Sequence, residues 1–233
     1  MTAPHLSIVL PVLNEEAIIA TTLGNLSLLR ARGAEIIVAD GGSADRTVEL
    51  ARPMSDRLIV ATRGRGSQMN AGAAAARGDV LVFLHADTRL PADADRLVTD
   101  GLRGGAHAWG RFDIDIEGSR PLFPVIAAAM NLRSRMTGIA TGDQAIFVKK
   151  TAFVAAGGYP DIPLMEDIAL SRELKRLSSP LCLTARALTS GRRWEAYGVV
   201  RTILMMWRLR LAFYFGVEPA KLAERYGHVA RRA

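Results

Sequence analysis

Four short apolar runs, each followed by a polar or glycine-containing turn and a helical pattern, limit what the N-terminal part of this chain can fold into. The runs are LSIVLPV (6–12), EIIVAD (35–40), RLIVAT (57–62) and DVLVFLH (79–85), and the helical patterns lie mainly at 15–30, 45–51 and 67–76. Strands that alternate with helices predict βαβ units with right-handed crossovers. We therefore expect an α/β fold whose mostly parallel central sheet is flanked by helices.

The pattern becomes looser after Pro91. Residues 110–117 alternate apolar and acidic side chains, which predicts a strand with one face in water. QAIFVKK (144–150) predicts a further strand, and MEDIALSRELKRL (165–177) predicts a helix with an apolar stripe. No internal repeat or low-complexity linker interrupts the sequence, so we expect one domain followed by a C-terminal extension.

The charge balance favours an anionic partner. A net charge of +7 and a pI of about 10.2 suit a nucleotide, a nucleic acid or a lipid surface. Aromatic residues make up only 6% of the chain and the arginines are scattered, so we expect no nucleic-acid binding. The single Cys182 excludes an intramolecular disulfide and a cysteine-based zinc site, and its neighbours, PLCLTA, predict a small buried hydrophobic side chain.

The sequence also bears on localisation. MTAPHLSIVLPV lacks the basic segment and the long apolar segment of a signal peptide. No run of about 18 uncharged apolar residues occurs, so we expect no spanning helix. These features predict a cytoplasmic protein.

Polar residues follow the apolar runs, at the strand ends where parallel sheets bind ligands. Asp40 precedes two glycines, and its carboxylate suits a nucleobase or a ribose hydroxyl. Arg63, Arg65 and the amides of residues 64–67 suit a phosphate group beside a helix N-terminus. At any single strand end, these residue types are equally typical of a structural turn. Their occurrence at the ends of several strands together indicates a nucleotide site.

Two further polar pairs carry candidate chemistry. Asp87 suits a divalent cation that neutralises a leaving diphosphate, and His85 suits either the same cation or the ribose. Glu166 and Asp167 begin a helical segment, where carboxylates commonly cap a helix. Beside a nucleotide site, one of them becomes a candidate general base for an acceptor hydroxyl.

The order and spacing of several fragments resemble the family 2 glycosyltransferases over nearly the whole chain. The fragments are SIVLPVLNEE, IIVADGGSADRT, RGRGSQMNAGAAAARGDVLVFLHADT, TGDQAIFVKK, GGYPDIPLMEDIALSREL and RRW. The resemblance implies the GT-A fold, a Rossmann-like fold of nucleotide-diphospho-sugar transferases. It implies a catalytic domain over 1–190, with a nucleotide-binding half (1–90) and an acceptor and catalytic half (91–190), and a C-terminal helical extension over 191–233.

The same resemblance implies an inverting transfer from a nucleotide-diphosphate sugar, with Asp167 as general base and Glu166 beside it. It assigns Arg192 and Arg193 to the diphosphate and Trp194 to the acceptor, although Ser190 stands where some members have the Gln of QxxRW. The implied nucleotide-binding residues are Pro11, Leu13, Glu15, Asp40, Arg63, Gly66 and His85. The implied ligands of a divalent Mn²⁺ or Mg²⁺ are Asp87 and His85, the latter replacing the first acid of the DxD element.

Several alternatives stay open. We expect a UDP-sugar as donor and a small molecule or a lipid-linked molecule as acceptor, with residues 120–138 in the acceptor region. We expect the tail at 197–216 to pack on the domain, although a peripheral contact with the inner face of the membrane and a homodimer contact are alternatives. A sugar nucleotidyltransferase and a nucleotide-sugar-binding pseudoenzyme are the rival functions. The pattern also resembles a small bacterial subgroup associated with radical-SAM and selenoprotein-type pathway genes.

Overall fold

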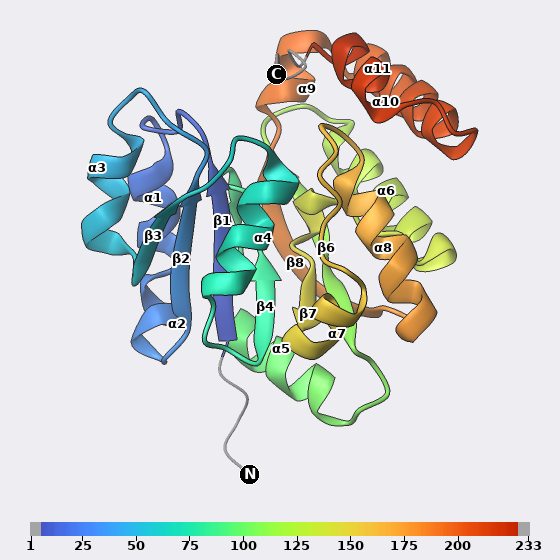
Figure 1. Cartoon of the computed structure of the whole chain (residues 1–233). Helices are drawn as coiled ribbons and strands as arrows, with labels where there is room; N and C mark the ends of the chain where they lie inside the picture. The colour runs from blue at the N-terminus through green and yellow to red at the C-terminus, as the bar shows by residue number, and fades with distance from the viewer. Residues whose placement is uncertain (1–5, 228–233) are drawn as a thin grey trace.

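The computed structural model describes residues 6–227, which form one eight-stranded sheet with helices on both faces (Figure 1). The strand order is β3-β2-β1-β4-β7-β6-β8-β5. The strands are β1 (Leu6–Val12), β2 (Glu35–Asp40), β3 (Arg57–Val60), β4 (Val80–Phe83), β5 (Thr88–Arg89), β6 (Trp109–Glu117), β7 (Phe147–Lys149) and β8 (Leu181–Ser190).

The first four strands pair in parallel, in the order β3-β2-β1-β4, and β6 pairs in parallel with β8. The antiparallel pairs are β4 with β7, β7 with β6, and β8 with β5. The predicted α/β class with a mostly parallel sheet is therefore confirmed. The four predicted N-terminal strands are also confirmed, although β3 ends at Val60.

The helices differ from the sequence prediction mainly near the N-terminus. The single helical pattern expected at 15–30 forms two short helices, α1 and α2, because Gly24 and Asn25 are poor helix formers where the two meet. The helices are α1 (Ile19–Asn25), α2 (Ser27–Ala31), α3 (Thr47–Ala51), α4 (Arg65–Ala75), α5 (Ala94–Arg103), α6 (Phe123–Thr137), α7 (Lys150–Ala155), α8 (Glu166–Leu177), α9 (Arg192–Tyr197), α10 (Val199–Tyr214) and α11 (Pro219–Arg225), with 3₁₀ turns η1 (Arg52–Met54) and η2 (Gly142–Gln144).

Two apolar clusters bury the two faces of the sheet. Ile8 and Leu10 of β1 pack with α1, α2 and α5, whereas Val9 of the same strand packs with α4, α7 and α8. This alternation follows from the two-residue period of a strand. Strands that are covered on both faces have continuous apolar sequences, and the first four strands were predictable for this reason.

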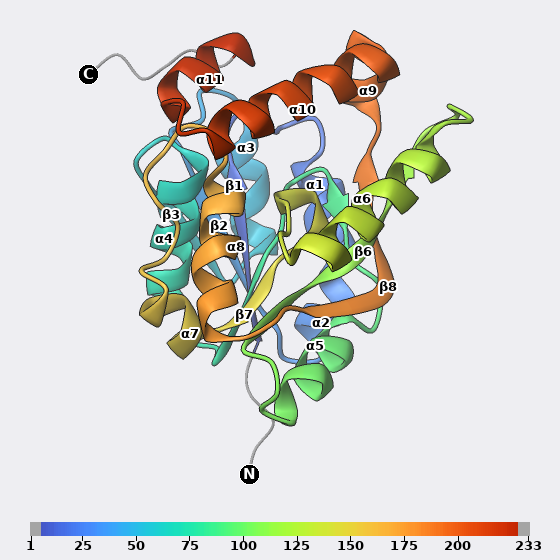
Figure 2. The ribbon, with the colours of Figure 1, turned by 90° about the vertical axis from the view of Figure 1, so that its right-hand side faces the viewer.

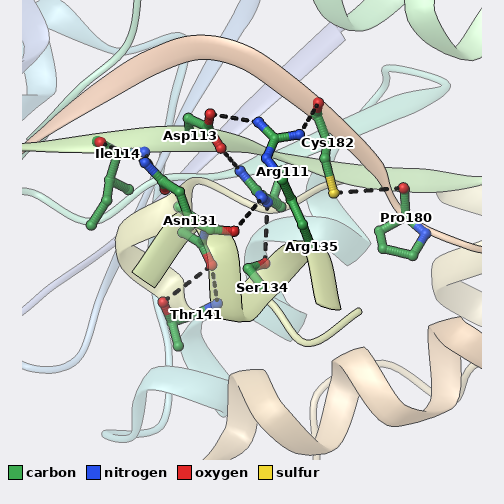
Figure 3. Close-up of polar contacts among 10 residues, drawn as sticks. Arg111, Asp113, Ile114, Asn131, Ser134, Arg135, Thr141, Pro180 and Cys182 are labelled. Atoms are coloured by element: carbon green, nitrogen blue, oxygen red, sulfur yellow. Dashed lines mark hydrogen bonds and ion pairs between the residues drawn. The ribbon is translucent and has the colours of Figure 1, made fainter. Parts of the chain in front are cut away.

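Strand β6 departs from the prediction of one face in water. Asp113 is ion-paired with Arg111 and Arg135 (Figure 3). Asp115 is ion-paired with Arg186. These ion pairs to Arg135 of α6 and Arg186 of β8 leave Asp113 and Asp115 half-buried and only Glu117 exposed, and a strand pattern alone does not reveal such pairing. Cys182 also differs from its prediction, because it is half-buried rather than buried.

The C-terminal helices lie over the carboxyl ends of the parallel strands. Strand β8 ends at Ser190, and α9, α10 and α11 follow. Helix α10 crosses above α6 and α8 (Figure 2). Leu209 of α10 packs with Ile168 of α8 in a cluster that also includes Leu222 of α11, so the tail is joined to the body of the fold.

Candidate active site

The loops after β1 and β2 are bonded to each other. The amide of Asn14 donates to Ser43 Oγ (2.9 Å), and the amide of Ala44 donates back to Asn14 Oδ1 (2.8 Å). The amide of Glu15 donates to Thr47 Oγ1 (2.7 Å). Asn14 has a positive φ of 54°, a costly conformation for a residue with a side chain. These contacts fix the backbone at two strand ends that we predicted to bind a nucleotide.

The structure uses some of the predicted nucleotide-binding residues for other contacts. The buried Asp40 carboxylate accepts hydrogen bonds from the amides of Gly42 (2.9 Å) and Ser43 (3.0 Å). A Cβ on Gly66 would lie 2.7 Å from the carbonyl oxygen of Pro160, so this glycine allows a close backbone contact. Arg63 is exposed, and Pro11 and Leu13 are half-buried. Direct nucleotide contacts of these residues stay predictions.

Gln68 is a positioning residue that the sequence analysis did not single out. Its side chain is buried, and Nε2 donates to the carbonyl oxygens of Val12 and Ala39, each at 2.8 Å. The amide of Gly64 donates to its Oε1 (3.3 Å). Gln68 thus joins the ends of β1 and β2 to the loop before α4. A glutamine in the first turn of a helix that follows a glycine-containing loop is the only sequence signal for this role.

His85, just after β4, faces the 3₁₀ turn η2. Its Nδ1 lies 3.6 Å from Oδ1 of Asp143, and a Cβ on Gly142 would lie 2.1 Å from its Cε1. Burial acts to raise the pKa of Asp143, but the hydrogen bond and charge of His85, together with the charges of Arg65 and Arg210, make the net shift downward. The sequence analysis missed Asp143, because a sequence alone does not show that TGDQ folds against the end of β4.

Two carboxylates that follow strand ends influence each other: Glu15, after β1, and the exposed Asp87, after β4. Burial, and next the charge of Asp87, raise the pKa of Glu15, whereas the charge of Arg192 lowers it. Arg192 is oriented by Ser190 Oγ, which accepts from its Nε at 3.1 Å. The charges of Asp87 and Arg192 thus both act on Glu15, an arrangement that suits a site for a diphosphate and a cation.

The predicted catalytic pair begins α8. Asp167 Oδ2 accepts from the amide of Gly142 (2.9 Å), and Oδ1 accepts from the amide of Ile168 (2.7 Å). Burial, and next the charge of Glu166, raise the pKa of Asp167, while Gly142 and Arg210 act in the opposite direction. A carboxylate with a raised pKa is suited to accept a proton near neutral pH.

Glu166 has a different partner. Its side chain is only 3% exposed and forms an ion pair with Arg65 at 3.1 Å. Met165, the residue before it, has a positive φ of 70°. The chain is thus strained at the point where both carboxylates enter the site.

The remaining predicted residues lie after β8. Trp194 is half-buried and packs against Ile114, Phe123 and Ile126, so its predicted acceptor contact would use the exposed part of the ring. The side chain of Arg193 lies outside what the structure describes.

The residues at the strand ends fit a divalent cation that the substrate helps to hold. Among residues 6–227, no group of three or more His, Cys, Asp or Glu side chains is arranged as a metal site. Mg²⁺ and related cations are commonly bound by one or two carboxylates together with substrate phosphates. The exposed Asp87, whose charge acts on Glu15, is such a carboxylate.

Sequence comparison matches residues 7–153 to the family described as glycosyl transferase family 2. A PGL/p-HBAD biosynthesis glycosyltransferase of Mycobacterium tuberculosis is 33% identical over 114 residues, which are 46% of this chain and 44% of that protein. An undecaprenyl-phosphate 4-deoxy-4-formamido-L-arabinose transferase of Pseudomonas aeruginosa is 33% identical over 110 residues, covering 42% of this chain and 32% of that protein. The match therefore spans less than half the length of these curated relatives.

Solved structures share the fold. S. aureus TarS in complex with UDP-GlcNAc has a TM-score of 0.63 and 16% identity, covering 80% of this chain and 58% of that one. The mannosyltransferase PcManGT from Pyrobaculum calidifontis, in complex with GDP-Man and Mn²⁺, has a TM-score of 0.62 and 20% identity, covering 97% and 65%. At such identities the likeness is one of fold.

Proposed function

Because this chain belongs to glycosyl transferase family 2 and has the GT-A fold, we propose that it transfers a sugar from a nucleotide-diphosphate donor to an acceptor hydroxyl by one inverting displacement. The observation that carries the proposal is the position of Asp167. This carboxylate has a raised pKa and is bonded to Gly142, the residue against which His85 of the β4 end packs. A proton acceptor thus lies beside the strand ends that suit the donor.

The donor occupies the ends of β1, β2 and β4, with a UDP-sugar as the first expectation. The bonds between the β1 and β2 loops support this, because they hold the backbone in place before a ligand arrives. TarS and PcManGT are in complex with UDP-GlcNAc and GDP-Man, respectively, which supports a nucleotide-sugar donor in general. We assign the nucleotide to Pro11, Leu13, Glu15, Asp40, Arg63, Gly66 and His85.

Asp87, with His85 as the second candidate ligand, holds a divalent Mn²⁺ or Mg²⁺ together with the donor diphosphate. Burial is the main cause of the raised pKa of Glu15, and the charge of Asp87 is the next. This second cause supports a cation here, because a positive charge relieves the repulsion between the two carboxylates. When bound, the cation neutralises negative charge on the departing diphosphate. Arg192 and Arg193 supply further positive charge to the same group.

Asp167 removes the proton of the acceptor hydroxyl. The bond between the anomeric carbon and the diphosphate oxygen breaks as the acceptor oxygen bonds to the opposite face of that carbon, and the nucleoside diphosphate leaves. The proton ends on the Asp167 carboxylate. Glu166 stays paired with Arg65 and raises the pKa of its neighbour rather than taking the proton itself.

Product analysis tests the reaction class. The protein is incubated with UDP-sugars, GDP-sugars and TDP-sugars and with candidate acceptors. Release of nucleoside diphosphate supports the transferase, whereas release of pyrophosphate in a parallel incubation with nucleoside triphosphates and sugar 1-phosphates would identify a sugar nucleotidyltransferase. Tight donor binding with neither transfer nor hydrolysis, across a broad set of acceptors, would identify a pseudoenzyme.

The outer face of α10 is the part of the tail that we assign to a membrane surface. Packing of the tail on the domain is confirmed for the face that carries Leu209. The opposite face exposes Trp207 (71%) and Tyr214 (71%), and Arg201 and Arg208 line a groove between α10 and α11. Exposed aromatic side chains beside arginines suit the headgroup region of an anionic bilayer. No helix in the described part of the chain is long and apolar enough to cross a membrane.

This assignment places the protein at the inner face of the membrane and makes a lipid-linked acceptor accessible to it. A homodimer that covers the same face is the alternative, and it is an outcome of the vesicle experiment described below. Membership of the radical-SAM and selenoprotein-associated subgroup stays a prediction.

A further inference from the structure

Two arginines lie near the proposed base without a hydrogen-bond partner for their buried nitrogens. They are Arg133 of α6 and Arg210 of α10. Nε and Nη2 of Arg133 and Nε of Arg210 are inaccessible to solvent and have no partner within the described residues. Buried N–H groups are nearly always bonded, so donors left unpaired at a site point to a ligand.

The two guanidinium groups are not neutralised by ion pairs. Neither forms an ion pair with a carboxylate within the described residues, although the charges of Asp167 and Asp143 act on both. Burial, and next the charge of Arg210, lower the pKa of Arg133 to about 10. Two like charges are therefore held close together beside the base.

The fold holds this arrangement in place. Helix α6 is bonded to β6 by the buried Arg111, which donates to Ser134 Oγ (3.1 Å) and to the carbonyl oxygen of Asn131 (3.2 Å) (Figure 3). The Asn131 side chain also bonds both backbone groups of Ile114. Arg133 lies between these two anchors in the sequence, so its backbone cannot move without breaking them.

We propose that Arg133 and Arg210 together bind an oxyanion of the acceptor, a phosphate or a carboxylate, beside the hydroxyl that Asp167 deprotonates. The proposal rests on the proposed function and specifies its acceptor class. A planar guanidinium group can donate two parallel hydrogen bonds to two oxygens of either anion. A bound anion would pair the orphaned N–H groups and remove the repulsion between the two arginines.

Two observations favour the acceptor over the donor as the source of this anion. Arg133 and Arg210 both interact with Asp167, the proposed base, as well as with Asp143, which lies beside His85. Arg192, the arginine that we assign to the donor diphosphate, interacts instead with Glu15. Residue 133 also falls in the 120–138 segment that we expected to contact the acceptor.

Titration calorimetry tests the proposal, with inorganic phosphate as probe and with UDP and Mn²⁺ present to fill the donor site. We expect phosphate to bind the wild type, and to bind Arg133→Gln and Arg210→Gln roughly tenfold or more weakly, since a hydrogen bond to a charged group contributes about 1.5–3 kcal/mol. Arg176→Gln, an exposed arginine on α8 outside both proposed binding surfaces, is the control and should bind phosphate like the wild type. Affinity for UDP should be unchanged in all three variants.

Unchanged phosphate binding in both variants would overturn the proposal. Loss of UDP affinity in parallel with phosphate would also overturn it, because the arginines would then hold the donor diphosphate. If a Gln variant does not fold, Arg133→Lys and Arg210→Lys keep the charge, and weakened phosphate binding without loss of Tm is the expected result.

The proposed function can fail separately. If UDP does not bind the wild type, phosphate is titrated alone, and dependence on Arg133 and Arg210 but not on Arg192 supports the anion site without the donor site. Replacing phosphate by glycerol 3-phosphate and by dihexanoyl phosphatidic acid then distinguishes the source of the anion. Tighter binding of the lipid indicates a lipid-linked acceptor, and equal binding indicates a soluble one; either result supports the site.

Discussion

Arg65 and Glu166 form an ion pair, with Nη1 and Oε1 3.1 Å apart, that joins the N-termini of α4 and α8 across 101 positions of sequence. Arg65 follows the β3 end, and Glu166 precedes the proposed base. The pair therefore connects the proposed donor side of the site to the proposed acceptor side. It also leaves the negative charge of Glu166 beside Asp167, where that charge raises the pKa of Asp167.

Two substitutions should shift the pH profile in opposite directions. Asp167 acts as a base only when ionised, so kcat/KM falls as the pH drops through its raised pKa, which lies above the ordinary value of about 3.9. Removing the negative charge in Glu166→Gln should lower that pKa and move the acid limb to lower pH. Arg210→Gln removes a positive charge and should move it to higher pH. Profiles of kcat/KM between pH 4 and 9, roughly, measure both, and shifts of the same sign would contradict the assignment.

Asp167→Asn should keep donor affinity and lower turnover by roughly 10²–10⁴-fold, the usual contribution of general base catalysis. The amide side chain is of similar size but cannot accept the hydroxyl proton. Titration with UDP and single-turnover transfer assays separate binding from chemistry. Asp115→Asn is the control. It removes a carboxylate of β6 that is ion-paired with Arg186 of β8, and it should retain wild-type turnover. Turnover that survives in Asp167→Asn would remove this residue from the mechanism.

Asp87→Ala should abolish the metal-dependent part of donor binding. In the wild type we expect UDP with Mn²⁺ to raise Tm more than UDP alone, because ligands that bind only the folded state stabilise it. The variant should show the same Tm shift with and without the cation. Asp100→Ala, an exposed carboxylate on α5, should behave like the wild type. A cation-dependent shift that persists without Asp87 would show that other groups bind the cation.

Gln68 should matter for stability as well as for donor binding. Gln68→Leu loses two hydrogen bonds from Nε2 to strand ends, and we expect the free energy of unfolding to fall by about 1–3 kcal/mol. Gln68→Glu should lower the free energy of unfolding further, because a buried carboxylate would face the carbonyl oxygens of Val12 and Ala39. Urea unfolding measures both. A Glu variant as stable as the wild type would mean that the side chain is not held as described.

The lipid contact predicts salt-sensitive binding to anionic vesicles. Wild-type protein should sediment with phosphatidylglycerol vesicles at low salt and be released at high salt, since surface charges are screened. Trp207→Ala combined with Arg208→Gln should reduce sedimentation, whereas Val154→Ser, an exposed apolar residue on α7, should not. No binding by the wild type, together with a dimer in sedimentation velocity, would assign this face to self-association.

The candidate site residues that a sequence can suggest are those that a single strand end or helix start defines. Asp40, Asp87 and the Glu166–Asp167 pair each follow or precede a recognisable element, and a parallel sheet brings such ends together. Contacts that depend on packing between distant segments were missed, among them the facing of His85 and Asp143. Orphaned donors such as those of Arg133 have no sequence signature, because burial of a single nitrogen is decided by the helices around it.

The placement of α10 has a consequence for how the enzyme is made. Arg210 joins a cluster whose other members come from much earlier in the chain, so the last charged contact of the site is synthesised well after its base. During translation the strands β1 to β4 can assemble first, since N-terminal units generally fold first. A ribosome that stalls after α9 would therefore leave a product that keeps the proposed donor-binding residues but lacks Arg210, one of the two arginines of the proposed anion site. We expect such a fragment to bind nucleotide sugar without transferring the sugar.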